Sequence, residues 1–186
     1  MLRIFCFFTL SFTFGQVEQI KTWDASEIKS IHLDFPWASS VLVSTHNSLL
    51  IEVNYLKEGE YQNLFLLQGK IKGAGFYLEE HEIPSSERPV DKLSVHKVVA
   101  NKIEIKIPTN LVLNLNLKEA QLKCSGVFES LNIGIEHGEA TFNVADPKGT
   151  IISLAADLHF YGLNSPQLPK KLKASSALGS LVVHPN

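Results

Sequence analysis

Three acidic residues, Glu119, Glu139 and Asp157, stand where apolar, strand-like segments meet. With Ser180 as the next short polar residue of this kind, the spacings are 20, 18 and 23 residues. If the segments stack as coils, the carboxylates lie about 5 Å apart along the stack, close to the spacing of neighbouring strands. Glycoside hydrolysis uses two carboxylates about 5 to 10 Å apart in a cleft. This carboxylate ladder is an alternative catalytic group. Its structural interpretation is that a short polar residue at each turn satisfies backbone N–H groups.

A second set of residues has the chemistry of binding. Lys92, His96 and Lys97 could meet an anionic ligand such as an acidic sugar. Their structural interpretation is the polar face of a strand whose other face bears Leu93 and Val95.

Aromatic residues near the start of the chain are also candidates. Trp37, together with Trp23 and Phe35, could stack on sugar rings. Alternatively, such aromatics plug the open end of a stacked core. We therefore take Trp37, Lys92, His96 and Lys97 as the candidate binding residues.

The run Glu79, Glu80, His81 and Glu82 contains metal-ligand residue types. Alternation along a strand puts Glu80 and Glu82 on one face and the other two on the opposite face, so only one pair could converge. The run predicts a solvated edge strand, charged against edge-to-edge pairing. The sequence has no CxxC, HExxH, serine elbow or phosphate-cradling glycine loop. We expect neither a metal nor a cofactor.

The elements that would position these residues are short alternating segments. Ile103, Ile105 and Ile107 alternate with polar residues up to Pro108, and a similar alternation follows over 111–117, 131–135, 140–144, 151–160 and 172–183. A period of two predicts strands. In the first half, 31–35, 41–43 and 49–55 also predict strands, and 65–68 with 76–78 predict a strand pair or lateral hairpin.

The nearly regular return of these strands predicts an all-β fold. A coil of about 18–23 residues cannot bury its own apolar face, so coils must stack with their strands in parallel. We predict a right-handed parallel β-helix, or β-solenoid, in the C-terminal half, with a β-rich N-terminal half. Leu115, Ile133 and Leu154 would then stack as equivalent positions. The competing fold is an antiparallel β-sandwich.

The sequence resembles the bacterial putative-adhesin family of exported β-solenoid domains, related to the head domains called GIN. The resemblance rests on the isoleucine-rich strand ending at Pro108, the leucine ladder after it, the turn 124–126, and the corners 138–140 and 156–158. The block 91–98 is similar to one in uncharacterised members. The resemblance implies an extracytoplasmic β-helical scaffold, and it implies no settled activity.

Composition and the first residues fit an exported protein. The 186 residues are 45% hydrophobic and 19% charged, enough for one domain with a sizeable core. The net charge of −2 argues against nucleic acid as a partner, which needs a basic face. Residues 1–15 combine Arg3 with an apolar run too short to span a membrane, which predicts a cleaved signal peptide and no transmembrane segment in the mature chain. Cys124 is then the single cysteine of the mature chain, and we expect it to be buried.

These observations together predict a single all-β domain over residues 16–186, with an N-terminal part (16–89) and solenoid coils (90–186). We expect an exported, non-catalytic envelope or surface protein in the periplasm, on the cell surface or outside the cell. It would be an adhesin-like binding or scaffold module for an envelope glycan or protein. The alternative is a small β-helical carbohydrate-active enzyme that uses Glu119, Glu139 and Asp157.

Overall fold

The computed structural model describes residues 17–58, 64–83 and 100–186. Every regular element in these ranges is a strand, so the all-β prediction is confirmed. The predicted signal peptide and the candidates Lys92, His96 and Lys97 lie outside the described residues. The strands are β1 (Val17–Asp24), β2 (Ser30–Phe35), β3 (Ala38–His46), β4 (Leu50–Glu58), β5 (Phe65–Lys72), β6 (Gly75–Glu82), β7 (Ala100–Pro108), β8 (Val112–Gly126), β9 (Ser130–Val144), β10 (Gly149–Leu163), β11 (Leu172–Ser176) and β12 (Leu181–Pro185).

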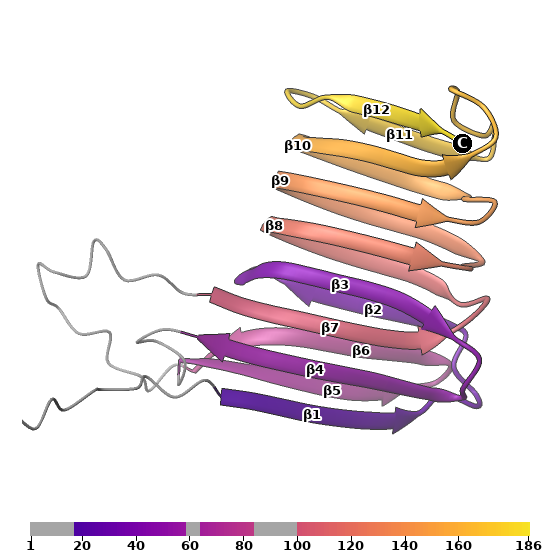
Figure 1. Ribbon diagram of the computed structural model, residues 1–186. Coiled ribbons are helices and arrows are strands. Elements are labelled where there is room, and N and C mark those ends of the chain that lie inside the picture. The colour runs from indigo at the N-terminus through magenta and orange to yellow at the C-terminus, as the bar shows by residue number, and fades with distance from the viewer. Residues whose placement is uncertain (1–16, 59–63, 84–99) are drawn as a thin grey trace, which may run out of the picture.

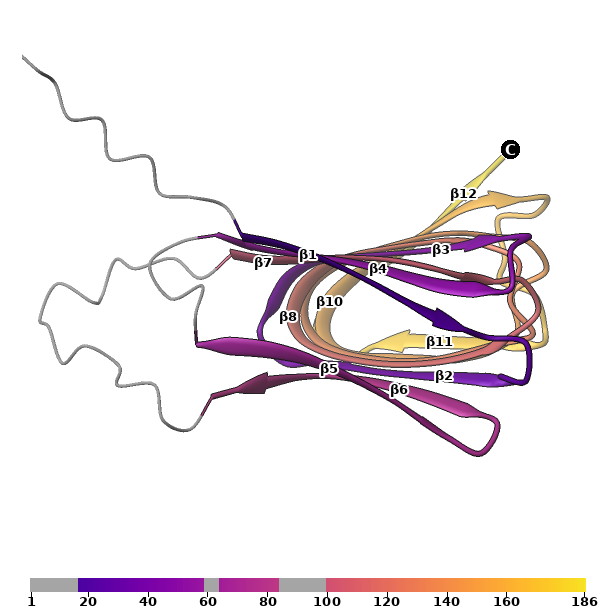
Figure 2. The ribbon, with the colours of Figure 1, turned by 90° about the horizontal axis from the view of Figure 1, so that it is seen from below.

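The strands form one mixed sheet that folds over on itself into two facing layers (Figures 1 and 2). The long strands β8, β9 and β10 each bend, so that their first halves belong to one layer and their second halves to the other. The first layer continues through β2, β6 and β5, and the second through β3, β7, β4 and β1. The apolar core fills the space between the layers.

Pairing between the long strands is parallel. In both the β8–β9 and the β9–β10 pair each residue faces the one 18 positions away, as in Leu115 with Ile133 and Ile133 with Ile151. The step from β10 to β11 and β12 is 23 residues, as in Ile151 with Ala174. This parallel register excludes the antiparallel sandwich for this part of the chain.

The register corrects two predicted positions. Leu154 does not stack on Ile133, because Ile151 holds that place; Leu154 points outward and is 49% exposed. Glu119 does not stack on Glu139 either. It faces His137, and Gln121 is the residue in register with Glu139.

The N-terminal half continues the same sheet. β2 and β3 pair in parallel with the first and second halves of β8. The predicted hairpin exists as β5 and β6, but β6 also pairs with β2, so the hairpin is part of the sheet and not lateral to it. β7 lies between β3 and β4, strands that precede it in the chain.

One aliphatic row illustrates how the core is held. Its members occupy equivalent positions on six neighbouring strands, and five of them are at most 3% exposed. They are Leu78, Leu33, Leu115, Ile133, Ile151 and the partly buried Ala174. Each side chain contacts its equivalents above and below, so a coil that is apolar on one side only is stabilised by its neighbours. Cys124 is buried, as predicted, and burial raises its thiol pKa.

Small residues occupy the bend where each coil passes between the layers. Ala120, Gly138, Ala156 and Gly179 take the same place in successive coils. Gly138 has a φ of 120°, and a Cβ there would overlap the carbonyl oxygen of Ala120 in the coil before it. At Gly138 two backbones thus approach too closely for a side chain.

The register can be tested with two aliphatic truncations. Ile133→Ala removes a buried side chain and should lower the free energy of unfolding by about 2–5 kcal/mol. Leu154→Ala, on the outward face, should change it by no more than about 0.5 kcal/mol. Urea denaturation of both variants measures the difference. Equal losses would contradict the register.

The close approach at the bend can be tested with Gly138→Ala. The substitution combines a positive φ with a backbone overlap, so we expect a loss of at least about 2 kcal/mol in the free energy of unfolding. Gly134→Ala in the same strand is the matched control, because a Cβ there would lie 3.2 Å from Asn116 Oδ1 and meet no backbone. A loss for Gly138→Ala no greater than for the control would show that the bend tolerates a side chain.

Candidate functional site

A cavity of about 560 Å³ lies at the bend, where β2 passes into β3 beside the bends of β8 and β9. We call it the arch cavity. Its lining residues are Pro36, Trp37, Ser39, Lys118, Glu119, Ala120, Gln121 and Gly138. The small residues at the bend leave this hollow unfilled, and the longer polar side chains beside them border it. The cavity therefore brings together Trp37 and Glu119, which the sequence suggested for different reasons.

Trp37 supplies the aromatic surface of the arch cavity. Its side chain is 38% exposed, and its ring packs against Phe65 at 5.6 Å between centroids. Trp37 is thus not the plug of the core. Phe35 is fully buried in the core. Trp23 packs on the core, with 4.9 Å between the centroids of its ring and that of Phe76. A ring that is anchored on one side and accessible on the other can contact a ligand at little cost in conformational entropy.

A buried carboxylate fixes the backbone beneath Trp37. Glu80 is 3% exposed, and its Oε2 accepts the backbone N–H of Trp37 at 3.0 Å. Its Oε1 accepts the Tyr55 hydroxyl and the Asn101 amide, each at 2.7 Å. The predicted solvated edge strand is therefore wrong for this residue, since β6 is paired on both sides and Glu80 points into the core.

The electrostatics of this cluster follow from its burial. Burial raises the pKa of Glu80, and the hydrogen bonds from Tyr55, Asn101 and the backbone of Trp37 and Ala38 oppose that rise in part. Burial, together with the nearby Glu80, also raises the pKa of Tyr55. Glu80 links four strands, because Tyr55 belongs to β4, Asn101 to β7, and Trp37 precedes β3. The sequence pattern did not reveal it, since the charged and polar residues Glu79, His81 and Glu82 around it suggested a solvated strand.

The corner carboxylates do not form a continuous ladder. The residues in register are Gln121, Glu139, Asp157 and Ser180. Asp157 Oδ1 accepts both the backbone N–H and the hydroxyl of Ser180 at 2.7 Å, and these bonds lower the Asp157 pKa. A carboxylate held in this way is suited to accepting hydrogen bonds and not to donating a proton. The pattern of a small residue, a polar residue and an apolar residue at each corner would have identified Gln121 in place of Glu119.

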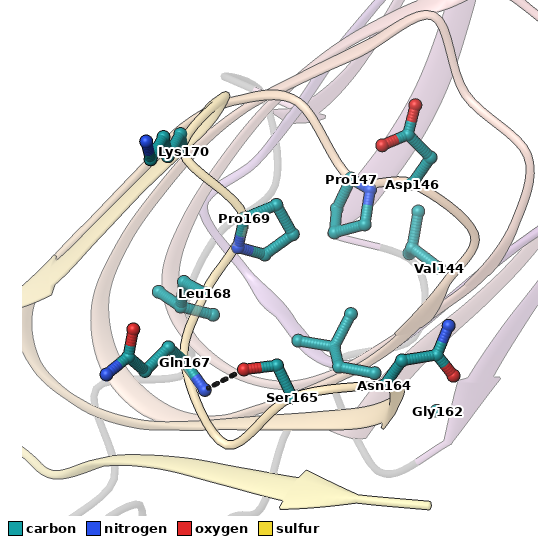
Figure 3. Close-up of a pocket in the computed structure, with 11 residues that line it drawn as sticks. Val144, Asp146, Pro147, Gly162, Asn164, Ser165, Gln167, Leu168, Pro169 and Lys170 are labelled. Atoms are coloured by element: carbon teal, nitrogen blue, oxygen red, sulfur yellow. Dashed lines mark hydrogen bonds between the residues drawn. The ribbon is translucent and has the colours of Figure 1, made fainter.

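Two further hollows lie elsewhere on the surface. One, of about 460 Å³, lies between the turn after β9 and the loop from β10 to β11, with an apolar floor that includes Val144, Pro147 and Leu168 (Figure 3). Asp146 and Lys170 stand at its border. The other, of about 200 Å³, is a shallow groove on the outward side of β2, β6 and β8. Its His32 and Tyr77 rings stack on each other at 4.4 Å, so each ring covers one face of the other.

Within the described ranges, no group of three or more His, Cys, Asp and Glu side chains could hold a metal ion. In particular, Glu79 is engaged by Lys70 at 3.0 Å and His81 at 3.2 Å, while Glu80 is buried. No helix in the part of the chain that the structure describes is long and apolar enough to cross a membrane.

A solved structure shares this fold. A putative cell adhesion protein from Clostridium sporogenes matches with a TM-score of 0.60 at 11% identity, over 91% of this chain and 99% of that one. A putative adhesin from Bacteroides fragilis matches with a TM-score of 0.33 at 12% identity, over 91% of this chain and 97% of that one. At such identities the likeness shows the fold alone, and only the first of these two scores is high enough to support an argument. No family model matches the sequence, and no curated protein matches it.

The raised pKa of Glu80 gives a pH dependence with a definite sign. The folded state keeps the proton of the Glu80 carboxyl group to a higher pH than the unfolded chain does. The free energy of unfolding therefore falls as the pH rises from the unfolded pKa, about 4.3, through the raised folded pKa. Glu80→Gln should remove this part of the dependence, as measured by urea denaturation at a series of pH values.

The neighbouring Glu79→Gln is the matched control. Hydrogen bonding to Lys70 lowers the Glu79 pKa, so its contribution is present above the unfolded pKa and is lost as the pH falls through the folded pKa. The two variants should thus change the pH profile in opposite directions. A Glu80→Gln profile parallel to that of the wild type would contradict the burial of a titrating carboxyl group.

Proposed function

We propose that this protein is an exported, non-catalytic, adhesin-like module that binds a glycan of the cell envelope through the arch cavity. The observation that carries the proposal is the placement of the half-exposed Trp37 ring beside Glu119 and Gln121. The surface role is consistent with the description of the Clostridium sporogenes protein, which shares this fold, as a putative cell adhesion protein.

The chemistry of the cavity fits a sugar ring. The face of a pyranose carries C–H groups that pack on an indole, and its hydroxyl groups both donate and accept hydrogen bonds. Glu119 offers an acceptor, the Gln121 amide offers both a donor and an acceptor, and Lys118 offers a donor. These groups stand on β8 and on the bend after β2, which the core holds rigidly. A few polar groups around an apolar surface, preformed before binding, are typical of ligand sites.

We infer that the scaffold is a right-handed parallel β-solenoid of the putative-adhesin type, related to the GIN head domains. The constant 18-residue step between β8, β9 and β10, the 23-residue step after them and the bending of each coil seen in Figure 2 support this assignment. The predicted signal peptide over residues 1–15 supports export to the periplasm, the cell surface or the medium.

A small carbohydrate-active enzyme is the second candidate function. It is favoured by one observation: Glu139 and Asp157 face each other on neighbouring parallel strands. Strand spacing places such residues about 5 Å apart, near the separation of the carboxyl groups in retaining glycosidases. Against it, Asp157 is engaged by Ser180, and its pKa is lowered. An enzyme of that kind needs a proton donor with a raised pKa.

The proposal is tested by glycan-array binding of the mature protein, followed by titration with the best glycan. Trp37→Ala and the double variant Glu119→Gln, Gln121→Ala should each weaken binding by at least ten-fold, about 1.4 kcal/mol. Leu154→Ala, an outward residue that does not line the cavity, is the control and should bind normally. Because Glu119 and Gln121 are exposed, the double variant keeps the fold, which thermal denaturation checks.

Incubation of the same glycan with the protein separates the two functions. New reducing or unsaturated ends that disappear in Glu139→Gln or Asp157→Asn would favour the enzyme and reject the non-catalytic proposal. Absence of binding to every glycan, or binding unaffected by the cavity variants, would reject the glycan site and favour a protein partner.

A further inference from the structure

Two histidines meet on the outward side of the second layer, away from the arch cavity. His159 lies in β10 and His184 in β12, which pair in parallel. His159 faces Val182 and Tyr161 faces His184, so the two imidazoles approach each other diagonally between neighbouring rungs. The outward orientation of His159 follows from alternation, since its neighbours in β10, Leu158 and Phe160, are buried. The Nδ1 atom of His159 is 3.3 Å from Nε2 of His184.

This separation suits a shared metal ion. Two nitrogens that each lie about 2.0–2.1 Å from a tetrahedral zinc ion are about 3.3–3.4 Å apart. The ring centroids are 5.6 Å apart, so the two nitrogens face each other almost along one line, and a metal ion bound to both requires each ring to tilt toward it. In the metal-free protein the two facing nitrogens share a hydrogen bond whose donor depends on the tautomer, at a distance longer than most such bonds. A metal would replace that proton as the link between the rings.

The surroundings hold one ring in place. Tyr161 stacks on His184 with 4.3 Å between centroids and 6° between planes, which restricts rotation of that imidazole. Asp157 lies two residues before His159 on the same outward row, and its negative charge favours a cation nearby. Both imidazoles are partly buried, so the site has a fixed inner side and an open outer side. Fixed ligand orientation raises metal affinity.

We propose that His159 and His184 form a two-ligand binding site for a divalent transition metal, with the remaining coordination positions open to water or to a ligand donor. The metal class follows from the ligands. Neutral imidazole suits Cu²⁺, Zn²⁺ and Ni²⁺, whereas Mg²⁺ and Ca²⁺ require oxygen ligands. The site departs from the expectation of no metal, which rested on the run of residues 79–82 and on the absence of CxxC and HExxH motifs.

The proposal is tested by calorimetric titration of the mature, untagged protein with Cu²⁺ and Zn²⁺, and with Mg²⁺ for comparison. We expect tighter binding of Cu²⁺ than of Zn²⁺, the order that divalent metals follow at nitrogen ligands. His159→Asn and His184→Asn should each weaken Cu²⁺ binding by more than about ten-fold, since even loss of a residue behind a ligand costs that much. In ¹⁵N spectra, Zn²⁺ should shift the ring nitrogens of these two histidines together.

His137→Asn is the matched control, because His137 is exposed on the neighbouring strand β9 and faces Glu119 and Ala155. Its metal affinity should equal that of the wild type, and thermal denaturation should show all three variants folded. The proposal is overturned if the double variant of His159 and His184 binds Cu²⁺ as tightly as the wild type. It is also overturned if His137→Asn weakens binding as much as the other two changes do.

Discussion

The register between parallel strands is the constraint on which the rest of this structure depends. An advance of 18 residues from β8 to β9 and from β9 to β10 places each aliphatic side chain on its equivalent. A slip of one residue would turn every inward side chain outward, because neighbouring residues of a strand point to opposite faces. The same register places the small residues at each bend, and therefore the arch cavity beside them. Core and candidate site are thus consequences of one pairing pattern.

The buried carboxyl group of Glu80 connects strands in the part of the sheet where the order of the strands departs from their order in the chain. Glu80 joins β6 to the bend before β3 and, through Tyr55 and Asn101, to β4 and β7. A charge-bearing group in the core costs free energy unless donors surround it, and here three hydrogen bonds of 2.7 to 3.0 Å do so. Hydrogen bonds have directions, so this cluster specifies which strands become neighbours, which apolar contacts alone would leave open.

Alternation in the sequence was sufficient to predict strands, stacking and an approximate repeat. Individual rungs were harder, because one polar residue points inward. Ser153 occupies a buried position in β10, where its hydroxyl accepts the backbone N–H of Ala156 at 2.6 Å. This local bond compensates for the burial of Ser153, and because successive residues of a strand alternate, Leu154 lies on the outward face. Glu119 was misplaced for another reason: acidity is a poorer marker of the corner than the small residue at Ala120, whose place Gly138 takes in the next coil.

The candidate site depended on pairings that the sequence does not encode locally. Trp37 lies between β2 and β3, and Glu119 belongs to β8, about 80 residues later in the chain. They line one cavity because β2 and β3 pair with the two halves of β8. Residue types identified both side chains as candidates, and only the non-local pairing shows that they belong to one site.

The pairing of β2 and β3 with strands that come later in the chain affects the order in which the sheet can form. β2 pairs with β6 and β8, and β3 pairs with β7 and β8, so every partner of these two strands comes later in the sequence. During synthesis or passage through a membrane in the N-to-C direction, β2 and β3 wait without partners until residues 75–126 have emerged. Their apolar side chains are exposed for that time, which is when aggregation competes with folding. The first half of the chain therefore completes its strand pairing only after β7 and β8 are available.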